Sequence, residues 1–408
     1  MSQQTQQILQ RGTDVLIANY GRIPLVMARG EGSYLWDTDG KRYLDLFAGF
    51  GGAILGHAHP ALVEAVTRQA QRLWHVGNTF YTEPQIELAE RLNKHAFRGQ
   101  AFFCHSGLES NEAACKLARL KGRQSSPNRW KIISLNRSFH GRSLAMISAT
   151  GNPKTRAGFE PAVPGFTQVE PCDLTALESS IDDETAGIIM EPIQGEGGIN
   201  LYCDEYPVRV RELCDKHGLV LIFDEVWTGC GRTGRWFGHQ HFARPSGSAN
   251  GSGIVEPDIM TLGKAVGGGL PVGVMFARPD LARLMVPGTH GSTLGANPIC
   301  MSASRTIFDV IERENLLANA ATLGEHAVSR LSKDPRIAGK VASVRGRGLM
   351  IGIELKEANE RIVEKGLERG IVINLTAQKV IRLAPPVNIS RQDWDQGLDL
   401  VTETIAAG

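Results

Sequence analysis

Two side chains that could take part in chemistry stand 40 positions apart, each at the end of an apolar run. Asp224 closes the run GLVLIFD, Lys264 closes IMTLGK, and glycine-rich segments follow both. In open α/β sheets the carboxyl ends of buried strands border the ligand crevice. There a lysine amine can bond to the aldehyde of pyridoxal phosphate, and an acid can keep its ring nitrogen protonated. Spacing alone leaves an alternative open, in which Lys264 is a solvated loop residue and Asp224 caps a helix.

The turn Ser106-Gly107-Leu108 is a second candidate site, because it follows an apolar strand and opens a helix. Free backbone N–H groups and the positive dipole end at a helix start bind anions together. The turn therefore suits a cofactor phosphate. A local alternative explains the same residues, with Ser106 as the N-cap and Glu109 completing a capping box.

Three more candidate side chains follow later strands. Phe139 and Arg142 stand in SFHGR after KIISL, and Glu191 ends the strand AGIIM. An aromatic ring can stack on a flat cofactor, and an arginine can hold a carboxylate through two parallel hydrogen bonds. Taken singly, Phe139 is more often a core residue and Arg142 more often a surface residue.

Two other patterns suggest different chemistry, but their contexts argue against it. Residues 229–234, GCGRTG, match the GxGxxG of nicotinamide and flavin enzymes. However, DEVW stands between the strand and the pattern, and the aromatic stretch RWFGHQHF follows where a helix should open. His57 with His59, and His239 with His241, have H-x-H spacing, but no cysteine or acidic cluster completes a metal site. We therefore expect neither a dinucleotide nor a metal.

Composition excludes several classes of partner. The 408 residues carry 44 basic and 43 acidic side chains, so the net charge is +1 and indicates neither nucleic acid nor a membrane surface. Seven cysteines without CxxC spacing are typical of small buried side chains in a reducing compartment, not of disulfides or zinc sites. Because no signal peptide and no long apolar run is visible, we expect a soluble cytoplasmic protein.

Apolar runs alternate with helical patterns through the middle of the chain, which predicts a doubly wound, mostly parallel sheet flanked by helices. We expect strands near 101–104, 131–135, 186–190, 219–223 and 258–262, and further strands in the last lobe within 341–355, 371–375 and 380–387. Helices are expected near 5–18, 61–74, 84–95, 111–120, 298–313, 358–369 and 391–406. A hairpin is expected over 33–47 and a Gly/Ser-rich surface loop over 243–254. The predicted organisation is a small-domain segment 1–60, a large domain 61–297 and the rest of the small domain 298–408.

Jointly these segments resemble class III (subgroup II) aminotransferases of fold type I, which use pyridoxal phosphate. The resemblance runs from GEGSYLWDTDGKRYLDLFAG and LGHAHP through FHGR, EPIQGEGG and HGST to VRGRGLMIGIEL. It implies a large domain with a mostly parallel seven-stranded sheet, and a smaller α+β domain built from both termini. It also implies that Lys264 bonds to the cofactor and moves the substrate proton, while Asp224 pairs with the ring nitrogen. The other implied cofactor contacts are Phe139 and Val226 on the ring faces, and Ser106, Gly107 and Leu108 at the phosphate.

The same resemblance implies a homodimer whose active sites are shared across the interface. Thr293 would reach the cofactor phosphate of the neighbouring subunit, with Ser292 near the substrate. Tyr20 and Phe50 would lie around the donor side chain. Phe50 stands where ornithine aminotransferases carry a tyrosine, which weakens ornithine as the donor.

Two arginines are implied to bind the substrates. Arg142 would hold the α-carboxylate, and Arg382 would pair with Glu191 until a carboxylate of 2-oxoglutarate takes the place of Glu191. In the implied ping-pong reaction an ω-amine donor, N2-acetylornithine or a related ornithine or diamine derivative, passes its amino group to 2-oxoglutarate. The products are an aldehyde and L-glutamate.

Two positions of the implied cofactor site depart from the family pattern. Trp227 stands where the family usually has a glutamine that contacts the phenolic oxygen of the cofactor. Its indole N–H either donates to that oxygen, or the ring turns away and narrows the pocket. Leu108 replaces a threonine or alanine, which removes a possible hydroxyl contact but keeps the backbone N–H.

Other functions remain compatible with these residues. The donor could be ornithine, succinylornithine or a 4-aminobutyrate-like amine, and a racemase or aminomutase could use the same cofactor without a 2-oxo acid. A non-catalytic binding or scaffold protein is the alternative from a different class. Retention of Asp224 with Lys264 argues against it, because a buried lysine without an aldehyde partner is costly.

Overall fold

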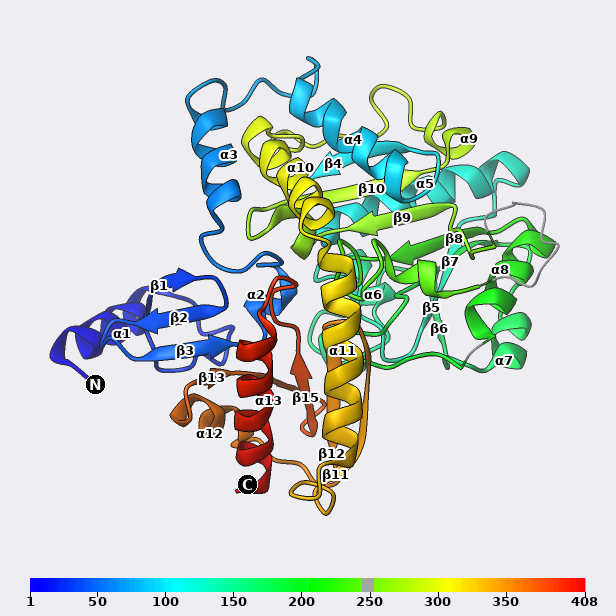
Figure 1. Ribbon diagram of the computed structural model, residues 1–408. Helices are drawn as coiled ribbons and strands as arrows, with labels where there is room; N and C mark the ends of the chain where they lie inside the picture. Colours follow the sequence, from blue (N-terminus) through cyan, green and yellow to red (C-terminus); the bar gives the residue numbers. More distant parts are fainter. Residues whose placement is uncertain (204, 244–252, 408) are drawn as a thin grey trace.

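The larger lobe of the computed structural model is built on a seven-stranded sheet in the order β4-β10-β9-β8-β7-β5-β6 (Figure 1). The structure describes residues 1–203, 205–243 and 253–407. Strand β10 is antiparallel to both of its neighbours, and all other pairs are parallel. The strands are β4 (Gln100–Cys104), β5 (Lys131–Leu135), β6 (Phe166–Val169), β7 (Thr185–Met190), β8 (Val220–Asp224), β9 (Ile259–Leu262) and β10 (Gly273–Ala277). The predicted doubly wound, mostly parallel sheet is confirmed.

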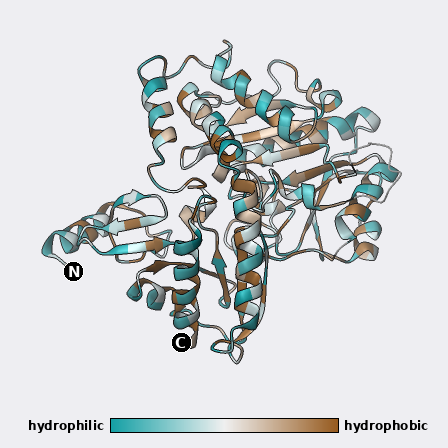
Figure 2. Cartoon of the chain, viewed as in Figure 1, coloured by the Kyte–Doolittle hydropathy of each residue, from teal (hydrophilic) through white to brown (hydrophobic). Residues whose placement is uncertain are grey.

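Helices cover both faces of this sheet. Alternate residues of β8 point to opposite faces, so Ile222 packs in the cluster beside α5 and Leu221 packs in the cluster beside α8. Every residue of β7, β8 and β9 is therefore buried, which explains their continuously apolar sequences. Figure 2 shows brown strands beneath helices whose faces mix teal and brown. The covering helices are α5 (Gly107–Ser125), α6 (Leu144–Ala149), α7 (Leu174–Ser179), α8 (Tyr206–His217) and α9 (Pro279–Ala282).

The end of α8 sets the position of Asp224. Gly218 ends the helix with a φ of 62°, in the left-handed region that glycine adopts without a steric penalty. The chain reverses there and enters β8 two residues later. Asp224 is the last residue of β8, so its side chain lies at the carboxyl edge of the sheet.

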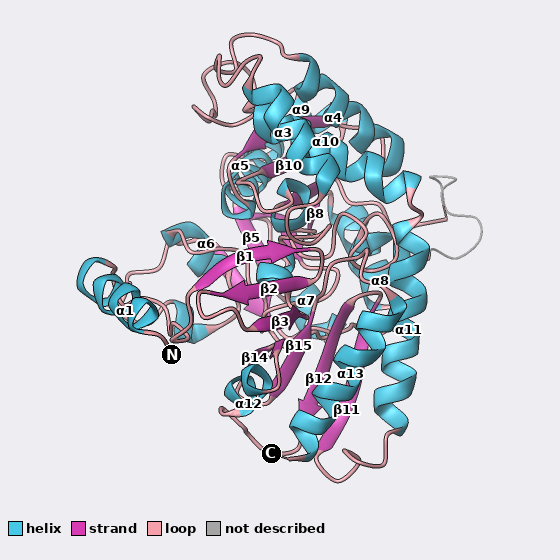
Figure 3. Ribbon diagram, turned by 60° about the vertical axis from the view of Figure 1, so that its left-hand side comes forward, coloured by secondary structure: helices cyan, strands magenta, loops and turns pink. Residues whose placement is uncertain are grey.

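The smaller lobe combines segments from both ends of the chain. The predicted hairpin is confirmed as β2 (Tyr34–Asp37) and β3 (Arg42–Asp45), which form one sheet with β1 (Met27–Glu31) and the C-terminal strand β13 (Ile371–Val372). A second sheet has the order β11-β12-β15-β14. Helix α11 packs on β11 and β12, and α13 lies beside α11 (Figure 3). These elements are β11 (Val341–Arg347), β12 (Met350–Leu355), β14 (Asn374–Thr376), β15 (Val380–Leu383), α11 (Leu316–Lys333), α12 (Ile362–Glu368) and α13 (Arg391–Ala406).

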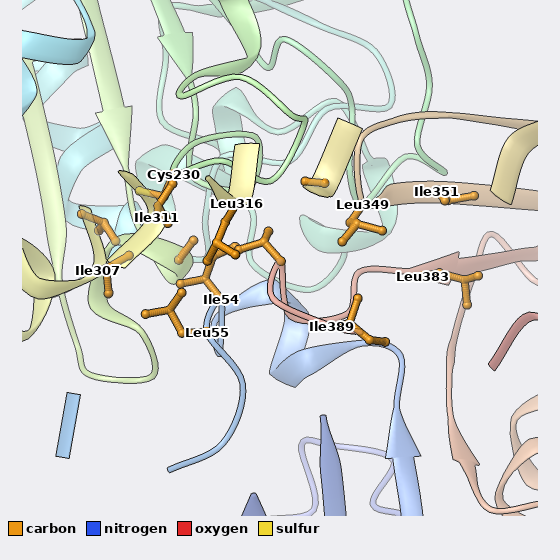
Figure 4. Close-up of a cluster of buried hydrophobic side chains, with 14 of the residues drawn as sticks. Ile54, Leu55, Cys230, Ile307, Ile311, Leu316, Leu349, Ile351, Leu383 and Ile389 are labelled. Atoms are coloured by element: carbon orange, nitrogen blue, oxygen red, sulfur yellow. The ribbon is translucent and has the colours of Figure 1, made fainter. Parts of the chain in front are cut away.

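One continuous hydrophobic cluster joins the two lobes. Helix α10 contacts α3, α4 and α11. Figure 4 shows Ile307 and Ile311 of α10 near Ile54, Leu316 and Leu349 in this cluster. The remaining helices are α1 (Gln3–Val15), α2 (Ala48–Gly51), α3 (Pro60–Ala70), α4 (Glu83–His95) and α10 (Pro298–Arg313). Because the cluster is buried, it holds the lobes that flank the site in a fixed relation.

The expected strands did not include β6 and β10, and the expected helices did not include α2, α6, α7, α8, α9 and α11. The expected loop over 243–254 falls largely outside the described residues, although Ala243 and Ile254 at its ends form an antiparallel bridge. The boundaries predicted at residues 60 and 297 stay predictions. Within the described part of the chain, no helix combines the length and apolar character that crossing a membrane requires.

Candidate active site

A cavity of about 400 Å³ opens at the carboxyl edge of the large sheet, where the predicted residues converge. Its lining includes the turn at the start of α5, the segment after β5 and the ends of β7, β8 and β9. The predicted site residues in this lining are Ser106, Gly107, Leu108, Phe139, Arg142, Glu191, Asp224, Val226, Trp227 and Lys264. Tyr20, Ser292, Thr293 and Arg382 are outside the lining of this cavity.

Asp224 is held in one orientation by three donors. Its Oδ2 atom accepts hydrogen bonds from His140 Nδ1 at 2.8 Å and from Asn111 Nδ2 at 2.7 Å, and Oδ1 accepts one from the Val226 N–H at 3.1 Å. The carboxylate is 3% exposed. Because Oδ2 is occupied by two side-chain donors, Oδ1 retains acceptor capacity for a further donor at the cavity.

Asn111, His140 and Thr261 form a support that the sequence interpretation missed. The amide of Asn111 is fully used, since it donates to Asp224 and the His140 carbonyl and accepts from Thr261 Oγ at 2.6 Å. Helical spacing could have pointed to Asn111, which lies four residues after Gly107 and so faces the same side of α5. No local signal marked Thr261, which reaches Asn111 from the neighbouring strand β9.

Lys264 follows β9 in a strained conformation, with a φ of 44°. Non-glycine residues in the left-handed region cost about 1–3 kcal/mol and cluster at functional sites. Its amine forms no hydrogen bond or ion pair within the described residues. Burial lowers the pKa of Lys264; Glu196 opposes that shift and Arg382 adds to it. A larger fraction of the amine is therefore neutral near pH 7, as a nucleophile or a base requires.

Trp227 forms the wall between Lys264 and Arg382. Its ring centroid lies 4.1 Å from Lys264 Nζ and 4.8 Å from Arg382 Cζ. The ring fits against two glycines, because a Cβ on Gly51 would come 2.5 Å from Trp227 Nε1 and a Cβ on Gly195 would come 2.1 Å from Cε3. The buried indole N–H has no acceptor within the described residues. The face of the ring is therefore presented to Lys264, while the N–H is directed at Gly51.

The turn at the start of α5 combines both interpretations of its sequence. Ser106 Oγ caps the helix by accepting from the Glu109 N–H at 3.3 Å, whereas the Glu109 carboxylate accepts from the His105 N–H instead of closing a full capping box. Gly107 and Leu108 line the cavity, and their N–H groups find no acceptor in the described parts of the chain. The helix start therefore both caps itself and offers donors to an anion.

Arg382 pairs with Glu196, so the predicted pairing with Glu191 is wrong. The Arg382 guanidinium lies 3.0 Å from Glu196 Oε2 and also donates to Asn374 and the Gly195 carbonyl. Glu191 accepts from the N–H groups of Phe139 and Gly195, both at 2.9 Å, so its two oxygens are directed at backbone amides. Whether Arg382 pairs with Glu191 or Glu196 depends on the path of the glycine-rich turn, which places Glu196 beside β15.

Burial sets the protonation of the two charged groups beside this turn. Desolvation, reinforced by the nearby Asp224 carboxylate, raises the pKa of Glu191 to about 7. Desolvation also lowers the pKa of Arg382, while Glu196 counteracts that shift. The pair of Glu196 with Arg382 thus stabilises a charge that the protein interior disfavours.

The predicted substrate residues are divided between the cavity and the outer surface. Arg142 is exposed at the cavity, with its Cζ 5.3 Å from the Phe139 ring centroid. Ser292 Oγ lies 3.4 Å from His105 Nδ1, beside the cavity. Tyr20 is 70% exposed and Thr293 is also exposed, so the structure does not bring either into the cavity of its own chain.

The rival motifs have structural roles. His57 bonds to Asp45 and His239 bonds to Glu225, each at 2.9 Å. No cluster of three potential metal ligands occurs among the described residues. Within the GCGRTG segment, buried Arg232 donates to the carbonyl of Leu349 at 3.0 Å and thereby ties the two lobes together.

The free groups in the cavity fit pyridoxal phosphate. At the start of α5 stand two N–H groups, and after β9 stands an amine, that have no partner among the described residues; an oriented acid stands at the end of β8. The phosphate end of the cavity requires glycine at position 107, because a Cβ there would clash with Val226 Cγ2 at 2.5 Å. The N–H groups, the acid and the amine match, respectively, the phosphate, the protonated ring nitrogen and the aldehyde of pyridoxal phosphate.

Comparison with known proteins agrees with this site. The model of the family described as aminotransferase class-III matches residues 16–405, so the chain belongs to the class III aminotransferases, which use pyridoxal phosphate. It is 42% identical to the acetylornithine aminotransferase of Aquifex aeolicus, over 96% of this chain and 99% of that protein. It is also 42% identical to the acetylornithine aminotransferase of Methanocaldococcus jannaschii, over 94% of each.

Solved structures show the same fold. The ornithine aminotransferase of Toxoplasma gondii superposes with a TM-score of 0.92 at 29% identity, covering 99% of this chain and 95% of that chain. The acetylornithine aminotransferase of Elizabethkingia anophelis superposes with a TM-score of 0.85 at 29% identity, covering 99% of each.

Proposed function

We propose that this class III aminotransferase transfers the ω-amino group of N2-acetylornithine to 2-oxoglutarate and releases an aldehyde and L-glutamate. The observation that carries the proposal is the pair of arginines around the cavity. Arg142 is exposed at the cavity, whereas Arg382 is buried and paired with Glu196. One pocket can then accept a side chain without a second carboxylate while the pair is closed, and a dicarboxylate when Arg382 is released. The kinship with acetylornithine aminotransferases supports this donor.

Pyridoxal phosphate, when bound, supplies an electron sink for the bond that breaks at the amine-bearing carbon. The residues that would hold it are Gly107 and Leu108 at the phosphate, Phe139 and Val226 at the ring faces, and Asp224 at the ring nitrogen. Ser106 would support the phosphate turn as its cap.

Lys264 is the group placed to move the proton at the reacting carbon. Its amine is free of hydrogen bonds within the described residues, and burial lowers its pKa, so it can accept a proton near neutral pH. The same amine would be the nucleophile toward the cofactor aldehyde. Asp224 would keep the ring nitrogen protonated, because its carboxylate is fixed by three donors and its Oδ1 retains acceptor capacity.

We further propose that the active unit is a homodimer in which each subunit completes the site of its partner. The support is the exposure of Thr293 and Tyr20 away from the cavity of their own chain. Mixing inactive Lys264→Ala subunits with Thr293→Asp subunits tests this proposal at limiting cofactor. A shared site predicts recovered activity, because one site of each hybrid has both native residues; no recovery in verified hybrids contradicts sharing.

The donor is tested by incubating the pyridoxal phosphate-loaded protein with 2-oxoglutarate and N2-acetylornithine, ornithine, succinylornithine or 4-aminobutyrate. Glutamate should form fastest with N2-acetylornithine. Faster glutamate formation from another donor would refute this substrate while leaving the aminotransferase class intact. Product formed without 2-oxoglutarate would indicate a racemase or aminomutase instead.

Cofactor attachment separates an enzyme from a binding or scaffold protein. Borohydride reduction of the loaded protein should fix the cofactor on the peptide that contains Lys264, and Lys264→Ala should prevent this. No attachment after saturation with pyridoxal phosphate would favour the scaffold.

A further inference from the structure

The seven cysteines divide sharply by exposure. Cys172 and Cys203 are exposed, Cys300 is half-buried, and the others are buried. The expectation that cysteines are small buried side chains is therefore wrong for Cys172 and Cys203. The two exposed thiols are also neighbours in space, although 31 positions separate them in the sequence. The remaining four cysteines are Cys104, Cys115, Cys214 and Cys230.

The two cysteines lie near the separation that a disulfide bond spans. Cys172 Sγ accepts a hydrogen bond from the Cys203 N–H at 2.9 Å. Since ordinary bond lengths place a sulfur about 2.8 Å from its own Cα, the two Cα atoms lie within about 7 Å of each other, near the range that disulfides span. Desolvation and the neighbouring Cys172 side chain together raise the pKa of Cys203 to about 11.

Both cysteines lie outside the helices and strands, where a small adjustment is possible without disturbing a sheet. Cys172 follows β6 and has a φ of 66°, next to Asp173, which caps α7. Cys203 precedes α8, and its carbonyl accepts from the Tyr206 N–H at 3.0 Å. Neither residue lines the active-site cavity, so their contact is separate from the cofactor chemistry.

We propose that Cys172 and Cys203 are a modification site, at which a low-molecular-weight disulfide such as oxidised glutathione forms a reversible intramolecular cross-link. In the first step a thiolate of the pair attacks the glutathione disulfide, forms a mixed disulfide and releases one glutathione thiolate. The second cysteine then loses its proton and attacks the mixed disulfide, which releases the other glutathione. Two cysteine thiols are oxidised, and one glutathione disulfide is reduced to two thiols.

The cross-link would brace the segment that carries two acids of the site. The chain between the two cysteines includes α7, β7 and the turn that bears Glu191 and Glu196. Joining its ends removes conformational freedom from the unfolded chain, so the oxidised protein should melt at a higher temperature than the reduced protein.

The test treats the full-length, cofactor-loaded protein with glutathione disulfide under native conditions. Free thiols are counted with a chromogenic disulfide reagent, and a non-reducing digest is analysed by mass spectrometry. We expect two thiols to be lost and a peptide joining Cys172 to Cys203 to appear, both reversed by dithiothreitol. Glutathione adducts without the joined peptide, or two unreacted thiols, would overturn the proposal.

Variants identify the roles of the two sulfurs and the effect of joining them. Cys203→Ser should leave a stable glutathione adduct on Cys172 and no rise in melting temperature, because the raised pKa of Cys203 makes Cys172 the readier attacking thiol. Cys300→Ser is the matched control and should form the joined peptide and show the rise, as the native protein does. A joined peptide without any rise in the native protein would contradict the brace, and a rise in melting temperature in Cys203→Ser would assign the rise to another site.

Discussion

Replacing Glu196 with glutamine should shift the balance between the two substrates. Glu196 holds Arg382 at 3.0 Å, and the arginine is only 2% exposed. If 2-oxoglutarate binds by displacing Glu196, then its binding free energy includes the cost of opening this pair. A charge-assisted hydrogen bond is worth about 1.5–3 kcal/mol, and each 1.4 kcal/mol is tenfold in affinity. Removing the competing charge should therefore strengthen binding of 2-oxoglutarate by roughly 10- to 150-fold at most.

The amine donor should respond in the opposite direction. With Glu196→Gln the buried charge of Arg382 loses its anionic partner while a side chain without a second carboxylate occupies the pocket. We expect kcat/KM for N2-acetylornithine to fall by roughly tenfold, as the loss of about 1.4 kcal/mol implies. Initial-rate measurements with both substrates varied give kcat/KM for each half-reaction separately. The ratio of the two values is the quantity that should move.

Glu191→Gln is the matched control, because Glu191 is the neighbouring buried acid that bonds to backbone amides rather than to Arg382. It should lower both kcat/KM values by a similar factor, since it disturbs the cavity wall without freeing the arginine. If Glu191→Gln moved the ratio and Glu196→Gln did not, the pairing that the structure shows would not be the one that governs substrate exchange.

Three other changes test the support of the site. Asn111→Leu should lower the free energy of unfolding by about 1.5–3 kcal/mol, because Asp224 loses a donor. Thr261→Val should lower it by about 1 kcal/mol. Chemical denaturation measures both changes, and equal effects would contradict this order. Burial raises the folded-state pKa of Glu191 to about 7, well above its usual range. Protonation of Glu191 therefore stabilises the folded state at acidic pH, and this stabilisation is lost as the pH rises toward 8. A denaturation series from pH 5 to 8 should show a decline of up to ~3 kcal/mol that Glu191→Gln flattens, and an unchanged decline in the variant would assign it to other groups. Gly107→Ala should weaken pyridoxal phosphate binding, since the new Cβ would lie 2.5 Å from Val226; adding Val226→Ala should restore binding, and failure to do so would locate the damage elsewhere.

The large sheet could be predicted because its information is local. Strands such as β8 lie under helices on both faces, so they carry a continuous apolar signal, and the acid or lysine that follows each run is displayed at the same edge. Strands β6 and β10 were missed, although β10 is fully buried. Strand β6 lies at the edge of the sheet and is only partly buried, so its sequence FTQV shows little hydrophobic pattern. Helix α11 has a clear apolar face, so the sequence contained the pattern that would have predicted it.

The error over Arg382 and the omission of Thr261 share one physical origin. Each interaction joins a strand residue to a side chain on another element, since Thr261 of β9 bonds to Asn111 of α5 and Arg382 of β15 pairs with Glu196 in the turn after β7. The partner is therefore decided by how the chain places these elements side by side. Two acids five positions apart, Glu191 and Glu196, are equally plausible partners on paper. Glu191 directly follows β7 and accepts hydrogen bonds from backbone N–H groups. The glycine-containing turn after it places Glu196 beside Arg382 of β15. A sequence pattern can place a charged group at the correct edge of a sheet. Which opposite charge that group pairs with depends on the path of the turn.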